Sequence, residues 1–147
     1  VVFVRADVRV GERRAPHQLD HAQLLLLREV AVDQRGELEQ VVGLPDLSGL
    51  GRQVVTLEWQ SLDGRVDPAF SERLSGLLEQ AGRGKDTDLF FICRSGARSR
   101  AAAEAMTSAG YDRCHNVAEG FEGPPDANRH RGKVAGWKAA GLPWVQG

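Results

Sequence analysis

Short apolar segments alternate along the chain with segments in which apolar residues recur at helical spacing. We expect strands at 28–33, 53–57, 89–92 and 114–117. Helical spacing or start signals predict helices from Pro16, from Asp67-Pro68, from Arg98-Ser99 through the alanine-rich run to 109, and over 133–140. Because parallel strands need crossover connections, this alternation predicts an α/β fold. The expected architecture is a central, mainly parallel sheet with helices on both faces.

The length and composition of the chain fit one globular domain. The chain has 147 residues, 41% of them hydrophobic and 27% charged, which is enough to bury a core. Residues 1–15 match no clear element beyond loose alternation of valines, so we interpret them as an N-terminal arm or an extra strand. Residues 16–147 are expected to form the domain.

The charge and the short apolar runs argue against two classes of partner. A net charge of −1 gives no basic field for nucleic acid, and the run 24–27 is far too short to span a bilayer. The start of the chain lacks a charged region followed by an apolar one. We therefore expect a cytoplasmic protein that binds neither nucleic acid nor membrane. Because the sequence begins at Val1, a removed upstream targeting segment stays an alternative.

Metal and cofactor motifs are also missing from the sequence. Cys93 and Cys114 form no Cys-x-x-Cys pair, and His17 and His21 lie one helical turn apart without a third ligand. We expect no metal site and no cofactor. Two cysteines without a disulfide framework fit a reducing compartment.

The stretch from Asp88 to Ser99 carries the strongest chemical signal. An apolar strand ends at Cys93, a short loop containing Gly96 follows, and Arg98-Ser99 open a helix. Backbone N–H groups of such a turn and the positive end of the helix favour an anion, and therefore the nucleophilic thiolate. We interpret Cys93 as a nucleophile. The structural alternative is a buried cysteine that happens to end a strand.

The loop contains no histidine, aspartate or glutamate that could act as a general base beside Cys93. Such a site must work by stabilising the thiolate and other anionic species. Two reactions fit these residues. The thiolate could attack a sulfane sulfur and store it as a persulfide, or attack phosphorus and form a phosphocysteine. Cys114, at the start of a short strand with no helix after it, is expected to be structural.

Several segments together resemble the single-domain rhodanese family. They are the Cys-Arg-Ser-Gly-Ala-Arg-Ser loop at 93–99, the Asn-Val-Ala-Glu-Gly turn at 116–120, and the Gly-Trp-Lys-Ala-Ala-Gly-Leu-Pro ending at 136–143. In addition, Val32-Asp33-Gln34-Arg35 resembles the Asp-Val-Arg segment of the family. The resemblance implies a rhodanese-like three-layer α/β sandwich and sulfurtransferase activity.

The resemblance also implies roles for individual residues. Cys93 would carry a catalytic persulfide, and the backbone of Arg94, Ser95, Gly96, Ala97, Arg98 and Ser99 would cradle the sulfur, with Asp33 and Arg35 in support. Four residues separate Cys93 from Arg98. Phosphatases and arsenate reductases of the same fold usually have a loop one residue longer, so the shorter loop favours sulfur.

The resemblance implies a small sulfur-containing anion, such as thiosulfate, as donor, and cyanide or a thiol as acceptor. A protein acceptor is compatible with it. Two alternatives stay open: a cysteine-based phosphatase or arsenate reductase, and a non-catalytic rhodanese-like binding module. We expect Arg94 to face the entrance and attract anions, and Arg98 to pair with Asp33 and brace the loop.

The chain departs from the family pattern around the last helix. The turn at 119–121 reads Glu-Gly-Phe instead of ending in two glycines, and about a dozen extra residues, 121–132, precede the helix. We expect this insertion to be a solvated loop rather than a border of the active-site entrance.

Overall fold

The computed structural model describes residues 30–32, 43–50 and 54–146 of the chain. The described elements are β1 (Val30–Val32), β2 (Leu44–Pro45), the short 3-10 helix η1 (Ser48–Leu50), β3 (Val54–Thr56), α3 (Phe70–Gln80), β4 (Leu89–Ile92), α4 (Ala97–Ser108), β5 (Cys114–Asn116), α5 (Gly136–Ala139) and β6 (Trp144–Val145). The predicted arm 1–15 and the helix from Pro16 lie outside these residues. The boundary at residue 16 therefore stays a prediction.

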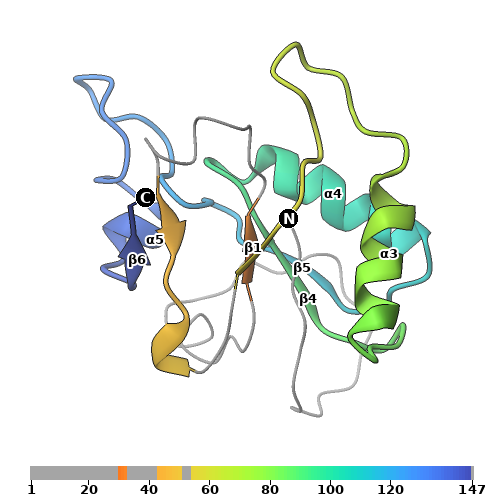
Figure 1. Ribbon diagram of the computed structural model, residues 1–147. Helices are drawn as coiled ribbons and strands as arrows, with labels where there is room; N and C mark the ends of the chain where they lie inside the picture. Colours follow the sequence, from red (N-terminus) through yellow and green to blue (C-terminus); the bar gives the residue numbers. More distant parts are fainter. Residues whose placement is uncertain (1–29, 33–42, 51–53, 147) are drawn as a thin grey trace.

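Four strands form a parallel sheet in the order β3-β1-β4-β5. Figure 1 labels β1, β4 and β5 of this sheet. The register places Phe91 beside Ala31 on one side and beside Asn116 on the other. All four correspond to predicted strands. The expected α/β class with a parallel sheet is confirmed.

Helix α4 returns the chain from β4 to β5 and packs on both strands, behind them in the view of Figure 1. In the register of β4 and β5, Leu89 and Phe91 share a face with Cys114 and Asn116, because side chains alternate along a strand. The core beneath this helix contains Leu89, Phe91, Ala102, Ala103 and Met106, all 0–2% exposed. The carboxyl end of β4 and the amino end of α4 are thereby fixed against each other.

Helix α3 confirms the helical spacing of Phe70, Leu74 and Leu78, all of which are buried. The helix begins at Phe70 rather than at the predicted Asp67-Pro68. Asp67 still stabilises the turn that precedes the helix, because its Oδ1 accepts a hydrogen bond of 2.9 Å from the Ala69 N–H. Trp59 packs edge-on against Phe70, with ring centroids 5.0 Å apart, so it covers the core.

The last helix is shorter than predicted. It begins at Gly136 rather than at residue 133. Gly136 has φ 89°, and a Cβ there would lie 2.8 Å from the Gly120 carbonyl oxygen. This left-handed conformation interrupts a helix, so the residues before Gly136 do not join α5.

Strands β2 and β6 form a separate antiparallel pair, in which Leu44 lies opposite Val145 and Pro45 opposite Trp144. The sequence patterns did not predict this pair, because each strand has only two residues and one contains proline. None of the helices in the described ranges is long and apolar enough to cross a membrane.

Candidate active site

Cys93 directly follows β4, and three residues (94–96) separate it from the start of α4 at Ala97. Gly96 precedes the helix with φ 89° and ψ −18°, in the left-handed region. Glycine adopts this conformation without the clash that a side chain would cause. The sharp turn brings the first backbone N–H groups of the helix back toward the sulfur of Cys93.

Three donors within the described part of the chain converge on the Cys93 Sγ. The Gly96 N–H lies 3.2 Å from the sulfur, the Ser99 N–H 3.4 Å and the Ser99 hydroxyl 3.3 Å. Two of the three are backbone groups held by the turn and by α4. This arrangement matches the needs of a sulfur anion, because hydrogen bonds are stronger when one partner is charged.

The carbonyl groups of Cys93 and Arg94 are held by the segment 121–123 that follows β5. The Cys93 carbonyl accepts from the Phe121 N–H at 2.8 Å, and the Arg94 carbonyl accepts from the N–H groups of Glu122 and Gly123 at 2.9 and 3.2 Å. In a trans peptide the N–H and C=O of one unit point in opposite directions. Holding these carbonyls on segment 121–123 therefore turns the N–H groups of Arg94 and Ser95 away from that segment.

Two glycines allow the loop to pack directly on the backbone that follows β5. A Cβ on Gly96 would lie 1.6 Å from the Ala118 carbonyl oxygen, and a Cβ on Gly120 would lie 2.3 Å from the Cys93 carbonyl oxygen. No side chain fits at either contact. The loop geometry therefore depends on glycine at both positions.

The predicted cradle residues divide into buried and exposed members. Gly96 and Ser99 are buried with Cys93, whereas Arg94, Ser95 and Ala97 are exposed. The place of Arg94 at the entrance stays a prediction.

Arg98 is partly buried in the first turn of α4. The predicted partner Asp33 lies outside the described residues, as does the supporting residue Arg35. The bracing ion pair between Arg98 and Asp33 therefore stays a prediction.

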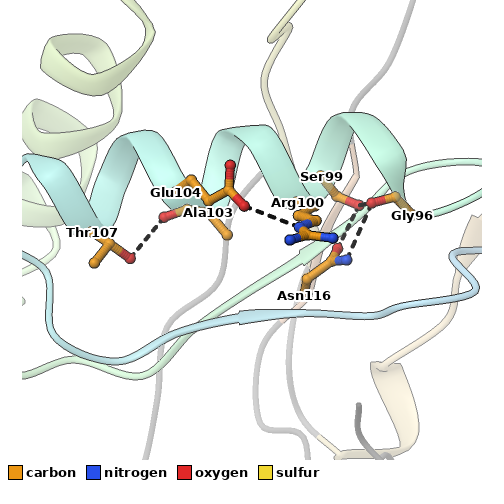
Figure 2. Close-up of polar contacts among 7 residues, drawn as sticks. All are labelled: Gly96, Ser99, Arg100, Ala103, Glu104, Thr107 and Asn116. Carbon is orange, nitrogen blue, oxygen red and sulfur yellow. Dashed lines mark hydrogen bonds and ion pairs between the residues drawn. The ribbon is translucent and has the colours of Figure 1, made fainter. Parts of the chain in front are cut away.

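Asn116 belongs to the site although sequence reasoning did not include it. Its Oδ1 accepts from the Ser99 hydroxyl at 2.7 Å, and its Nδ2 donates to the Gly96 carbonyl at 3.2 Å. Figure 2 shows these contacts between the end of β5 and the start of α4. The available signal was a polar residue on the core-facing side of a predicted strand, inside the Asn-Val-x-Glu-Gly segment.

The insertion 121–132 has two parts with different surroundings. Its first three residues hold the active-site loop, as described above, whereas Pro124, Pro125 and residues 127–130 are exposed. A tight turn closes the exposed part, in which the Asp126 carboxylate accepts from the N–H groups of Asn128 and His130. The His130 N–H in particular lowers the pKa of Asp126 from its ordinary value. The prediction of a solvated loop is thus correct for the exposed residues between 124 and 130 and wrong for residues 121–123.

Cys114 has different surroundings from Cys93. Its Sγ donates to the Tyr111 carbonyl at 3.4 Å. Burial raises the pKa of the Cys114 thiol to about 11, which keeps the thiol neutral and unreactive near neutral pH. The described residues also contain no group of three or more His, Cys, Asp or Glu side chains that could hold a metal ion.

One family model, several sequence relatives and a solved structure match the chain. A sequence model of the rhodanese-like domain matches residues 55–123. Uncharacterized protein RC0915 of Rickettsia conorii is 34% identical over 115 residues, which cover 78% of this chain and 80% of the relative. Uncharacterized protein RP600 of Rickettsia prowazekii is 33% identical over 114 residues, with 77% and 80% covered. The crystal structure of Rv0390 from M. tuberculosis is similar at 46% identity and a TM-score of 0.65, covering 82% of this chain and 86% of that one.

Proposed function

Because the chain belongs to the rhodanese-like domain family, we propose that it is a sulfurtransferase that works through a persulfide on Cys93. The donor is a small anion with a sulfane sulfur, of which thiosulfate is the simplest. The acceptor is cyanide or a thiol, either of a small molecule or of a protein.

The first step of the proposed reaction transfers sulfur to the enzyme. The Cys93 thiolate attacks the sulfane sulfur of thiosulfate, a new S–S bond forms, and the old S–S bond breaks with its electron pair leaving on sulfite. In the second step cyanide attacks the outer sulfur, and thiocyanate departs while the Cys93 thiolate returns. Neither step needs a general base at the sulfur, which agrees with the absence of an acidic residue or histidine from the loop 93–99.

The observation that carries the proposal is the convergence of three donors on the Cys93 Sγ at 3.2 to 3.4 Å. Preorganised donors stabilise an anion without reorganising during the reaction. Both the thiolate and the persulfide are sulfur anions, so one set of donors serves both. The four-residue spacing between Cys93 and Arg98 supports the same reading, since it makes a loop of small diameter.

The exposed Arg94 supports an anionic donor, because a cation beside the entrance attracts anions. We place the reaction in the cytoplasm, where two cysteines without a disulfide framework would stay reduced.

The proposal is tested by thiocyanate formation from thiosulfate and cyanide, using the wild type, Cys93→Ser and the matched variant Cys114→Ser. We expect Cys93→Ser to lose all turnover and Cys114→Ser to retain it. Turnover retained in Cys93→Ser would contradict the assignment. Hydrolysis of an aryl phosphate that depends on Cys93 would indicate a phosphatase, and no turnover of any sulfur donor would indicate a binding module.

A further inference from the structure

The segment 120–123 bonds the active-site loop with its N–H groups and the residues around α5 with its carbonyl groups. Its N–H groups donate to the carbonyls of Cys93 and Arg94, as described above. The carbonyls of Glu122, Gly120 and Phe121 accept three further hydrogen bonds. These come, in that order, from the N–H groups of Gly132, Trp137 and Lys138 at 2.7, 2.9 and 3.1 Å. The segment is therefore bonded on both sides.

Each peptide unit of this segment joins one bond on the α5 side to one bond on the loop side. The first unit connects Gly120 to Phe121. Its carbonyl accepts from the Trp137 N–H, and its N–H donates to the Cys93 carbonyl. The two units that follow are bonded in the same way. A peptide whose carbonyl accepts a hydrogen bond is polarised and donates more strongly, so the bonds on the α5 side strengthen those to the loop.

Gly136, the first residue of α5, lets the helix approach the segment this closely. It has φ 89°, and a Cβ there would lie 2.8 Å from both the Gly120 carbonyl oxygen and the Gly123 nitrogen. A side chain would therefore push α5 and the segment apart. The first N–H groups of a helix have no acceptor within it, and those of Trp137 and Lys138 bond the segment instead.

We propose that Gly136 is a positioning residue for the Cys93 sulfur: it seats α5 on the segment 120–123, which fixes the two peptide units that follow the cysteine. The next unit along the loop contains the Gly96 N–H, which lies 3.2 Å from the sulfur. The position of this donor therefore depends on the two units before it. This inference rests on the proposed function for its purpose but not for its test.

The test is the pH dependence of Cys93 alkylation by iodoacetamide, which reports the thiolate without any sulfur donor. Every protein compared carries Cys114→Ser, so that a single thiol reacts. We expect Gly136→Ala to move the midpoint of the profile upward by about one pH unit, which is a tenfold loss of thiolate below the midpoint. The reason is that the Gly96 N–H is no longer held at the sulfur.

Gly141→Ala is the matched control at the other end of α5. Gly141 also has positive φ, at 68°, but nothing lies within 4 Å of an added Cβ. This variant therefore has the backbone strain of Gly136→Ala without the close contact, and it should leave the midpoint unchanged. A midpoint that Gly136→Ala does not move, or that Gly141→Ala moves equally, would overturn the proposal.

A change of charge must be separated from this positioning. The charged side chains of the active-site loop, the segment and α5 are Arg94, Arg98, Glu122 and Lys138. The Lys138 Nζ lies 3.2 Å from the Glu122 Oε1, and Gly136→Ala could displace this ion pair. We therefore expect the same shift in a background with Glu122→Gln and Lys138→Met, which lacks the pair. A shift that disappears in this background would overturn the role of Gly136.

Thermal unfolding shows whether each variant is folded before its profile is compared. If Gly136→Ala does not fold, NMR of the Cys114→Ser protein takes its place. A contact that favours the thiolate is itself changed when the thiolate forms. The amide signals of Trp137 and Lys138 should therefore titrate at the midpoint of Cys93 alkylation, and no longer do so when Cys93→Ser is added. Signals that do not move across that midpoint would overturn the proposal.

The proposed function is judged separately. A shifted profile without sulfur transfer would contradict only the sulfurtransferase, whereas sulfur transfer with an unshifted profile would contradict only the role of Gly136.

Discussion

Cys93 and Cys114 lie near opposite ends of two neighbouring parallel strands, and their sulfur atoms meet opposite surroundings. Cys93 follows the last residue of β4, whereas Cys114 is the first residue of β5. Three donor groups lie 3.2 to 3.4 Å from the Cys93 sulfur. The Cys114 sulfur instead donates to the Tyr111 carbonyl, and its burial raises the pKa to about 11.

Burial alone does not distinguish Cys93, the proposed nucleophile, from Cys114. Cys93 is the more deeply buried of the two, at 1% exposed. The two cysteines differ in the edge of the sheet at which they lie. At the carboxyl end of β4 a left-handed glycine turns the N–H groups of α4 toward the sulfur, whereas the thiol at the amino end of β5 faces a carbonyl. The neighbouring backbone groups therefore give the two sulfur atoms opposite electrostatic surroundings, N–H donors at Cys93 and a carbonyl acceptor at Cys114.

The largest effect is expected when this turn is broken. Gly96→Ala puts a Cβ 1.6 Å from the Ala118 carbonyl oxygen, so we expect loss of at least about 3 kcal/mol of the free energy of unfolding, or no folded protein. Gly110→Ala is the matched control near Cys114. Gly110 also has positive φ, but nothing lies within 4 Å of its added Cβ, so its cost is only about 1–2 kcal/mol of backbone strain. Urea denaturation measures both, and equal stability of the two variants would contradict the close contact.

The next effect is selective labelling of the two thiols. At neutral pH we expect iodoacetamide to modify Cys93 at least about 100-fold faster than Cys114. Only a very small fraction of Cys114 is thiolate there, because its pKa is about 11. Peptide mass mapping over time gives both rates, and urea-unfolded protein, in which the two rates should converge, is the control. Faster labelling of Cys114 in the folded protein would reverse the comparison.

A smaller effect is expected on stability at high pH. The pKa of Cys114 is about 11 in the folded protein, above the unfolded value of about 8.5 to 9. The folded state therefore holds this proton more tightly. The resulting stability is fully present below about pH 8.5 and is lost as the pH rises toward 11.

The size of this loss is roughly 2 kcal/mol at pH 10.5. Cys114→Ala should lose correspondingly less stability between pH 8 and pH 10.5 than the wild type in urea denaturation. The other groups that titrate in this range are shared by both proteins, so their effects cancel in the difference. Equal losses of stability in the wild type and in Cys114→Ala would show that Cys114 does not cause the loss at high pH.

Much of this arrangement could be predicted from the sequence because it depends on local signals. The apolar run before Cys93, the glycine in the loop and the alanine-rich helix specify strand, turn and helix in one continuous segment. The spacing of Phe70, Leu74 and Leu78 likewise specified α3. The predicted start of the last helix was wrong because the left-handed conformation of Gly136 is tied to its close packing on Gly120. Gly120 is distant in sequence, so no local pattern indicates this contact.

Asn116 was missed for a similar reason. Its hydrogen bonds to Gly96 and Ser99 exist because β5 pairs with β4 in one particular register. A one-residue shift would turn the side chain to the other face of the sheet. The pairing of β2 with β6 also joins segments from the two ends of the described chain, and no local pattern indicates it.

The intact mass of the protein after incubation with thiosulfate reports directly whether a sulfur atom is bound to Cys93. We expect the wild type and Cys114→Ser each to gain one sulfur atom, which cyanide then removes. We expect Cys93→Ser to gain none. A folded wild-type protein that gains no sulfur from thiosulfate or another sulfane donor, or a Cys93→Ser variant that still gains one, would contradict the account.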